Sequence, residues 1–188
     1  MPGKKQTNKP KQEPLVKLRA FEKEDISKRH NVADNPATLR LLSSSTIMPR
    51  SLEEEAAIIE RCLTPKDKDS FYTFAIENRK GELIGSCGYK DVSPKNRRCR
   101  ISIAIYEERN WGKGYGTAAL RKLLDFLFLE KNMHKVWLTV FAFNPRAMAC
   151  YKKLGFREEG RLREHVYRDG KYHDAVLMGI FEREYRAD

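Results

Sequence analysis

The sequence predicts an α+β fold in which a mixed, largely antiparallel sheet is flanked by helices. Stretches with the two-residue period of strands alternate with stretches of helical period, in the order β-α-α-β-β-β-α-β-α-β-β. Three of the strands follow one another without an intervening helix, which predicts an antiparallel meander. A single mixed sheet flanked by helices is the simplest domain that uses this order.

The N-terminal part of the chain combines a polar tail with one strand and two helices. Residues 1–13 are rich in Lys, Pro and Gln and lack apolar periodicity, so we expect a disordered basic tail followed by a single domain over residues 14–188. The elements expected before the meander are a strand at residues 15–19, a helix starting at Phe21–Asp25 and a helix over Leu52–Cys62. Asn35-Pro36 and Met48-Pro49 are expected to break the chain between the two helices.

After residue 70 the sequence predicts the meander, followed by two helices and three further strands. The expected strands cover residues 71–77, 83–92, 100–105, 135–140, 156 onward and 175–181. One helix is expected to begin at Thr117, and a second is expected to cover Arg146–Leu154. Gly85 and Gly88 interrupt the second strand of the meander and predict a bulge or a close backbone approach. Asn144 is a natural cap for the last helix, with Pro145 at its first position.

Composition limits the class of protein. A chain of 188 residues with 40% hydrophobic residues predicts a globular fold. It has no run of 18 apolar residues and no secretory signal, so we expect neither a membrane span nor export. The four cysteines are scattered, which predicts neither a disulfide framework nor a metal site and favours a reduced, cytoplasmic protein.

The net charge of +11 suits an anionic cofactor, a nucleic acid or an acidic partner. Residues 1–13 carry four lysines and one glutamate, a net +3, so +8 belongs to the remainder. The excess is spread along the chain, and maintaining solubility is an equally good explanation of it.

A glycine-rich turn predicts a phosphate-binding site. The stretch Trp111–Thr117 reads W-G-K-G-Y-G-T between the third strand of the meander and the next helix. Its glycines, Gly112, Gly114 and Gly116, let the backbone approach a ligand closely, and Lys113 adds positive charge. A helix N-terminus also offers unpaired N–H groups and the positive end of its dipole.

Two other nucleotide motifs are disfavoured. The sequence of Gly114–Ala119 fits a relaxed G-x-G-x-x-A fingerprint, which requires an acid about 20 residues further on to hold a ribose. The next strand ends in Phe141–Asn144 without an acid, and the turn follows an antiparallel meander instead of the first strand of a parallel unit. A Walker loop fails because its first glycine and its Ser or Thr are missing.

A second motif, with the first, carries a family resemblance. Trp111–Thr117 resembles the acetyl-CoA pyrophosphate loop of the Gcn5-related N-acetyltransferases (GNAT), and Asn144–Phe156 resembles their N-x-x-A-x-x-x-Y-x-x-x-G-F element. Trp111 and the ending Tyr167–Asp174 are similar to the ribosomal-protein N-terminal (RimJ/RimL-like) and spermidine acetyltransferase branch. The superfamily loop often begins with Gln or Arg, so Trp111 removes one side-chain contact but leaves the backbone cradle intact.

The resemblance implies the GNAT fold and an acetyl-CoA-dependent N-acetyltransferase that moves the acetyl group directly to a primary amine. A protein N-terminal α-amine is the first acceptor it suggests, with association with the ribosome, and a polyamine or another small amine is the alternative. A homodimer is common in such families. From the charge alone, a non-catalytic basic module that binds RNA or the ribosome stays open as a different class.

The resemblance also suggests site residues. Tyr151 is expected to protonate the leaving thiolate, and Asn144 to contact the cofactor arm. The arm would pair with the main chain of Ile103 and Ile105. We expect the N–H of Ile105 to polarise the thioester carbonyl and Glu107 to act as base, with Glu108 as the neighbouring candidate. The expected cofactor contacts are Ile103, Ile105, Trp111, Gly112, Lys113, Gly114, Tyr115, Gly116, Thr117, Asn144 and Tyr151.

Structural explanations of the same residues stay open. Tyr151 has the spacing of a core residue, and Asn144 could act only as a helix cap. The acids Glu53–Glu55 could attract a cationic amine, although the helix dipole alone explains acids in a first turn. Asp174 and Glu164 are similarly ambiguous, and the four histidines are isolated in the sequence.

Overall fold

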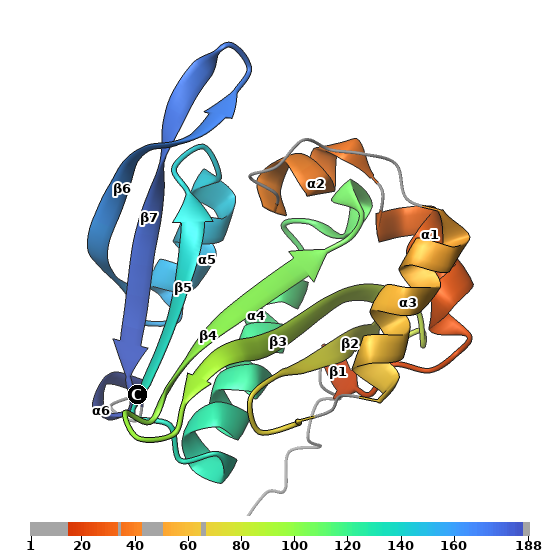
Figure 1. The fold of residues 1–188 in the computed structure, drawn as a ribbon, viewed down its shortest axis with the longest axis horizontal. Helices are drawn as coiled ribbons and strands as arrows, with labels where there is room; N and C mark the ends of the chain where they lie inside the picture. Colours follow the sequence, from red (N-terminus) through yellow and green to blue (C-terminus); the bar gives the residue numbers. More distant parts are fainter. Residues whose placement is uncertain (1–14, 34, 43–50, 65–66, 186–188) are drawn as a thin grey trace, which may run out of the picture.

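A seven-stranded sheet organises the computed structural model, which describes residues 15–33, 35–42, 51–64 and 67–185 (Figure 1). The strand order is β1-β2-β3-β4-β5-β7-β6, and every neighbouring pair is antiparallel except β4 and β5. The strands are β1 Val16–Arg19, β2 Tyr72–Asn78, β3 Leu83–Ser93, β4 Arg98–Ile105, β5 Lys135–Phe141, β6 Arg157–Arg168 and β7 Lys171–Phe181. The predicted mixed, largely antiparallel sheet is confirmed, whereas the expected tail and the Met48-Pro49 break lie outside the described residues.

Helices cover both faces of the sheet. They are α1 Asp25–Ala33, α2 Pro36–Leu42, α3 Leu52–Leu63, α4 Tyr115–Asp125, α5 Pro145–Lys153 and α6 Glu182–Tyr185, with a π-helical turn Phe126–Glu130 continuing α4. In Figure 1, α4 lies behind β3 and β4, whereas α1 and α3 lie in front of the sheet. The short helix α2 packs near the end of β4, where the Thr38 hydroxyl donates to the Tyr106 carbonyl at 2.7 Å.

Several predicted boundaries are wrong. The helix expected at Phe21–Asp25 begins at Asp25, and a third helix, α2, stands where Asn35-Pro36 was expected only to break the chain. The Asn35 side chain caps α2 by accepting the N–H of Ala37 at 2.9 Å, and Pro36 occupies the first helical position. The helix expected from Thr117 begins at Tyr115, because Gly114 adopts the left-handed N-cap conformation. The short helix α6 was not expected.

Two hydrophobic clusters, one on each face, hold the layers together. The larger one joins α4 and α5 to the sheet, and its fully buried members include the predicted helical series Leu120, Leu123, Leu124, Leu127 and Phe128. The smaller one, around Ile59, joins α3 to β2 and β3. Each fully buried large side chain contributes about 1.5–3 kcal/mol of transfer free energy, so the two clusters fix the sheet between its helical layers.

The two glycines of β3 allow neighbouring backbone to approach closely, as the sequence predicted. A Cβ added to Gly88 would lie 2.1 Å from the carbonyl oxygen of Tyr72, and one added to Gly85 would lie 2.3 Å from that of Ala104. Both contacts are far inside van der Waals range, so a side chain at either position would separate β3 from a neighbour.

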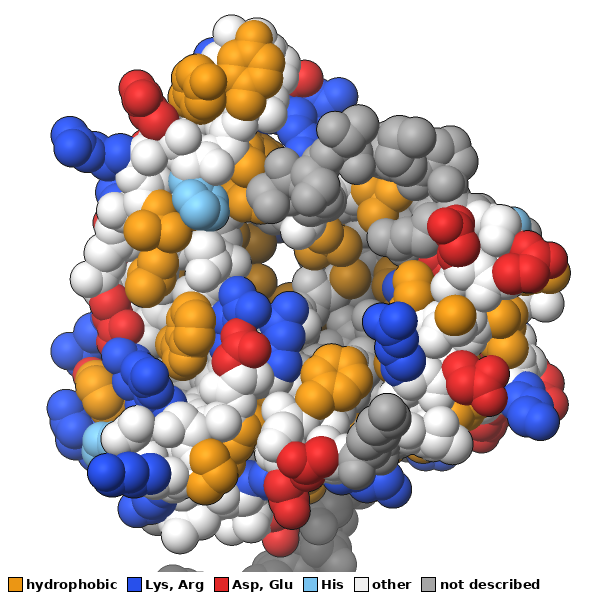
Figure 2. All heavy atoms as spheres, in the orientation of Figure 1, with side chains coloured by type: hydrophobic (Ala, Val, Ile, Leu, Met, Phe, Trp, Pro, Cys, Tyr) orange, Lys and Arg blue, Asp and Glu red, His pale blue; other side chains and the backbone are white. Residues whose placement is uncertain are grey.

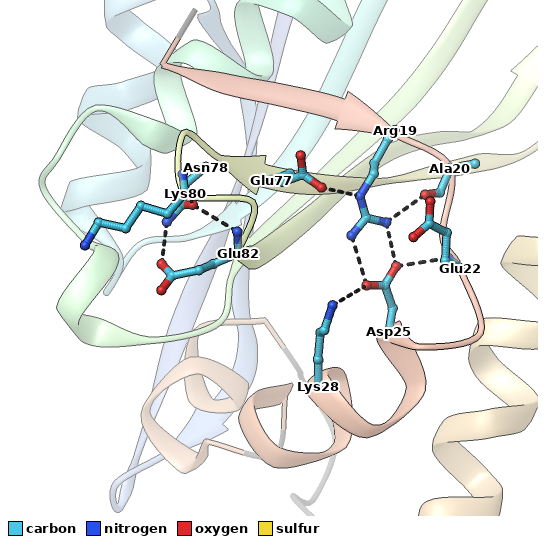
Figure 3. A network of polar contacts seen from close by, with 9 residues as sticks. All are labelled: Arg19, Ala20, Glu22, Asp25, Lys28, Glu77, Asn78, Lys80 and Glu82. Atoms are coloured by element: carbon cyan, nitrogen blue, oxygen red, sulfur yellow. Dashed lines mark hydrogen bonds and ion pairs between the residues drawn. The ribbon is translucent and has the colours of Figure 1, made fainter.

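An ion-pair network joins the first strand to the first helix. Figure 3 shows Arg19, at the end of β1, between Asp25 at the start of α1 and Glu77 on β2. The guanidinium donates to both Asp25 oxygens at 2.6 and 2.9 Å and to Glu77 at 2.6 Å. Burial alone would raise the pKa of Asp25, but the bonds from Arg19 and from the Glu22 N–H outweigh it and hold this pKa below its ordinary value.

We predict that Asp25→Asn lowers the free energy of unfolding by about 3 kcal/mol at pH 7, because it leaves the half-buried Arg19 guanidinium with Glu77 as its remaining carboxylate partner. Since the folded pKa of Asp25 is depressed, this contribution is present above about pH 4 and is lost as the pH falls through the folded pKa. Urea unfolding at pH 7 and pH 3 measures both effects. Lys28→Ala, which removes an exposed cation 4.0 Å from the same carboxylate, is the control and should change stability by less than about 0.5 kcal/mol.

Candidate active site

The sheet opens between its two parallel strands. β4 and β5 pair only at Arg98 with Lys135, Cys99 with Val136 and Arg100 with Trp137. Beyond these three pairs the strands diverge, and we call the space between them the β4/β5 gap.

Main-chain groups of β4 face the gap. The Tyr106 N–H donates to the Ile84 carbonyl of β3 at 3.0 Å, and these two residues stand opposite each other in the register of the antiparallel pair. Because hydrogen bonding alternates along such a pair, the N–H and C=O groups of Ile103 and Ile105 point away from β3, toward the gap. Within the described residues no strand pairs with them on that side.

The N-terminus of α4 lies at the open end of the gap. Gly112 and Gly114 have φ angles of 72° and 82°, which only glycine adopts without strain. The Ala118 N–H makes the first helical hydrogen bond, to the Gly114 carbonyl at 3.0 Å. The preceding N–H groups, from Tyr115 to Thr117, therefore have no partner within the helix and are available to an anion.

Gly116, in the first turn of α4, faces β4. A Cβ built there would lie 3.9 Å from the side chains of both Ile103 and Ile105, which is ordinary contact distance. Packing within the described chain therefore does not require glycine at this position. A ligand lying against the first turn would give a reason for glycine, because a Cβ would take up part of the space beside the turn.

Trp111 fastens the glycine turn to β4 and places an arginine beside it. Its indole N–H donates to the Ile105 carbonyl at 2.9 Å, and the Cζ of Arg146 lies 3.6 Å from the centroid of a Trp111 ring. Burial lowers the pKa of Arg146, because its guanidinium is partly removed from water, and no carboxylate forms an ion pair with it in the described part of the chain. A bound anion would offset this loss of hydration.

Helix α5 completes the wall opposite β4. The Asn144 side chain caps α5 by accepting the Ala147 N–H at 3.2 Å, which leaves its amide nitrogen without a partner among the described residues. Tyr151 is 8% exposed, and burial raises the pKa of its hydroxyl, so the hydroxyl is protonated at neutral pH. A contact of 3.2 Å between Thr117 Oγ1 and Cys150 Sγ holds α5 against the first turn of α4.

These elements enclose a cavity of about 910 Å³. Its wall includes Ile101, whose side chain packs in the larger hydrophobic cluster on the face of the sheet that α4 covers. The wall also includes Arg100 and Ser102, the neighbours of Ile101 along β4, whose side chains project from the opposite face. The cavity therefore passes through the gap from one face of the sheet to the other. Figure 2 shows it as a hollow between the part of the molecule that holds β5–β7 and the part that holds β4 and α2.

Helix α2 and the β6–β7 hairpin meet beside this hollow. The Arg40 guanidinium of α2 forms an ion pair with Asp169, at the turn of the hairpin. Thr38 and Leu41 of α2 and Leu162 and His165 of β6 line the same cavity. Residues far apart in the sequence thus form the side of the cavity that faces away from α4.

The cavity wall carries positive charge. Its cationic side chains in the described part of the chain are Lys90, Arg100, Arg146 and Lys153, and no Asp or Glu of that part lines it. Arg100 is already paired with Asp91 at 2.7 Å and lies over the Trp137 ring. The electrostatics favour an anionic ligand, but they do not by themselves attract a polycation.

Most of the residues predicted from the sequence come together here. Ile103, Ile105, Trp111, Gly112, Gly114, Tyr115, Gly116, Thr117, Asn144 and Tyr151 all line the cavity. Lys113 does not, because it points outward from the turn as an exposed side chain. Glu107 follows β4 but is outside the lining as well, and its carboxylate accepts hydrogen bonds from Arg109 at 2.8 and 3.1 Å.

The acids at the start of α3 have structural partners. Ser51 and Glu54 form a reciprocal capping box, and Glu55 is fully buried in an ion pair with Arg29. Sequence reasoning missed Arg146, Arg100 and His165 as wall residues. The one sequence feature that pointed to Arg146 was its position two residues after Asn144, the predicted cap of α5. No periodicity in the sequence indicated that Arg100 or His165 would line the cavity.

An open strand edge that ends at a helix N-terminus without a side-chain cap, with a buried phenol opposite, suits an extended ligand that carries phosphate at one end. The chain belongs to the GNAT family of acetyltransferases: the model of the acetyltransferase (GNAT) domain matches residues 16–157. The family resemblance read from the sequence is thereby confirmed.

Several relatives match nearly the whole chain. The spermidine N(1)-acetyltransferase of Escherichia coli (strain K12) is 28% identical over 173 residues, 92% of this chain and 89% of the relative. The SPbeta prophage-derived uncharacterized N-acetyltransferase YokL of Bacillus subtilis (strain 168) is 32% identical over 168 residues, 89% of this chain and 90% of the relative. The crystal structure of spermidine N-acetyltransferase from Vibrio cholerae in complex with CoA and spermine superposes with a TM-score of 0.79 at 27% identity, covering 92% of this chain and 98% of that one.

The chain is therefore an N-acetyltransferase that uses acetyl-CoA and an amine acceptor. Family membership makes it an enzyme, in contrast to the non-catalytic basic module that its charge left open. None of the helices in the described ranges is long and apolar enough to cross a membrane.

We predict that Trp111→Phe lowers the free energy of unfolding by about 1 kcal/mol. The phenyl ring can still pack against Arg146, but the Ile105 carbonyl loses its indole donor. Trp137→Phe is the matched control, because its indole N–H makes no hydrogen bond within the described chain. Equal urea midpoints for the two variants would contradict a stabilising role for the bond from Trp111 to Ile105.

Proposed function

We propose that the chain binds acetyl-CoA along the β4/β5 gap and transfers the acetyl group directly to a primary amine that enters from the opposite side of the cavity. The observation that carries this proposal is the edge of β4 at Ile103 and Ile105, which no described strand pairs with on the side of β5 and which leads to the free N–H groups of α4. An extended amide-bearing arm can pair with such an edge as an added strand. Its phosphates then lie at the helix N-terminus.

The phosphate end has three kinds of donor in this proposal. The glycine turn supplies backbone N–H groups from Gly112 to Thr117, and the dipole of α4 adds partial positive charge. Arg146, fixed over Trp111, supplies a full charge. Lys113 lies at the exposed rim of the turn, where it contributes long-range attraction only.

The reaction end requires a donor for the carbonyl oxygen and an acid for the sulfur. The Ile105 N–H points into the gap and is a donor of the kind that stabilises developing negative charge. Tyr151 is protonated and lies in the opposite wall, so its hydroxyl is suited to protonate the leaving thiolate. The amide nitrogen of Asn144 remains free to bind the arm.

Similarity favours a polyamine as the acceptor over the protein N-terminus suggested first by the sequence. The relatives named above that have a stated substrate act on spermidine, and one of their structures contains spermine. One observation supports the second candidate, an α-amine: the cavity wall offers no carboxylate among its described residues to hold further ammonium groups. A polyamine would have to place these groups at acids outside the cavity, whereas an N-terminal peptide has a single ammonium group to bury.

The proposal predicts CoA release when the chain is mixed with acetyl-CoA and a suitable amine. We expect calorimetry to detect acetyl-CoA binding, and turnover to be highest with spermidine or spermine in a panel that also holds peptides with free N-termini. Peptides with acetylated N-termini and no lysine are the control and should give no turnover. No binding at millimolar acetyl-CoA would contradict the donor site, and turnover of peptides alone would make the α-amine the acceptor.

A second prediction concerns the acid. Tyr151→Phe should lower kcat about 100-fold, because the hydroxyl that protonates sulfur is lost. The dissociation constant for acetyl-CoA should change less than about threefold, because this hydroxyl makes no other hydrogen bond within the described chain. Tyr72→Phe on β2, outside the cavity lining, is the matched control. Unchanged kcat in Tyr151→Phe would remove Tyr151 from the acid role.

A further inference from the structure

The wall of the cavity lacks the side chain usually expected to accept the proton of the acceptor amine. No Asp or Glu in the described part of the chain lines it. A primary amine is protonated in water near neutral pH and must lose that proton before it can attack a thioester. Imidazole is the side chain that ordinarily exchanges a proton in this range, and His165 is the histidine of the described lining.

A break in the β6–β7 ladder sets the position of His165. Leu162 pairs with Ala175 and Val166 pairs with His173, so three residues of β6 stand opposite a single residue of β7. Glu164, in the middle of the three, has a φ of 50°, which a side-chain-bearing residue adopts only at a cost. Such bulges re-aim a side chain, and they are common next to active sites.

The residue opposite this bulge holds it in place. Asp174 Oδ1 accepts the N–H of Glu164 at 3.0 Å, and its other oxygen lies 3.8 Å from the Arg161 guanidinium. On either side of the bulge, Leu162 contacts the cavity and Val166 is buried. Asp174 therefore fixes the backbone of the residue before His165 without reaching the cavity itself.

We infer that His165 is the general base of the transfer reaction and that Asp174 positions it by holding the bulge; this inference rests on the proposed function. His165 takes one proton from the ammonium group, directly or through one water, and releases it to solvent. The neutral nitrogen then forms the C–N bond to the carbonyl carbon, and the C–S bond breaks. Tyr151 gives its proton to sulfur and is reprotonated by the second proton that nitrogen loses.

The surroundings of His165 support this role. The charged and titratable groups around the bulge are Arg161, Arg163 and Glu164 on β6, His173 and Asp174 on β7, Asp169 at the hairpin turn and Arg40 on α2. Glu164 and Asp174 do not line the cavity, so neither replaces imidazole as the proton acceptor there. The cations in the wall, Lys90 and Arg100 among them, favour the uncharged form of an amine bound beside them.

Glu107 is the rival base, because it follows the strand whose main chain faces the gap. Its carboxylate is already bonded to Arg109 and lies outside the lining, as described above. The two candidates can be distinguished by substitution. The variant that lacks the true base should have a lower kcat/KM at pH 7, and its kcat/KM should rise steadily with pH.

The test is the pH dependence of kcat/KM from pH 5 to 9, measured with the amine that gives the highest turnover. For the unchanged chain and for His134→Gln, a histidine remote from the cavity, we expect kcat/KM to fall as the pH is lowered, because the base must be neutral to accept a proton. His165→Gln should lower kcat/KM about 100-fold at pH 7, with a steady recovery as rising pH supplies more neutral amine. Its affinity for acetyl-CoA, measured by calorimetry, should be unchanged.

Asp174 variants separate positioning from folding. Asp174→Ala should lower kcat/KM about tenfold, because the Glu164 N–H loses its acceptor, and Asp174→Asn should restore most of the rate, because its side-chain oxygen still accepts. The inference is overturned if His165→Gln stays within threefold of the unchanged chain with the same pH profile. It is also overturned if Glu107→Gln, and not His165→Gln, lowers kcat/KM at pH 7 and makes it recover steadily as the pH rises. Absence of turnover by the unchanged chain with every amine would overturn the proposed function itself.

Discussion

The incomplete pairing of β4 with β5 is the constraint on which the rest of the structure depends. A backbone N–H or C=O that is withdrawn from water must find a partner, so a strand edge left open inside a molecule needs a ligand or solvent to satisfy it. In this chain the open edge at Ile103 and Ile105 is continuous with the free N–H groups at the start of α4. The proposed ligand, extended and carrying amides at one end and phosphates at the other, would satisfy both sets of groups.

The fold prevents the gap from closing. At its narrow end the N–H groups of His134 and Lys135 both donate to the Arg97 carbonyl, at 2.6 and 3.1 Å, which fixes the start of β5 beside β4. β5 then pairs with β7 along its whole length, from Lys135 to Phe141, so its direction is set by the C-terminal strands. β4 is held equally firmly by β3, with the close contact at Gly85. The sheet thus has two parts, β1–β4 and β5–β7, and antiparallel pairing within each part fixes the direction of its strands. The gap lies at the boundary between these two parts.

The parts of this arrangement that were predictable from the sequence are those governed by local rules. The strand at Ile101–Ile105, the glycine turn, the cap at Asn144 and the leucine series of α4 depend on period, backbone freedom and capping, which short stretches display. Helix α2 was missed because it has seven residues, too few for a period, and is held by tertiary contacts such as the bond from Thr38 to Tyr106. The bulge before His165 was missed because its stabilising partner, Asp174, lies on another strand.

The two sides of the cavity present different kinds of groups to a ligand. The proposed donor side consists mainly of backbone groups, which many sequences can present as long as the glycine turn and the open strand remain. The acceptor side consists of side chains from α2, from the outward face of β4 and from the hairpin, and each can change without closing the gap. Under the proposed function, side chains such as Arg100 and His165 set the choice of amine, and they can change without altering the backbone groups of the donor side.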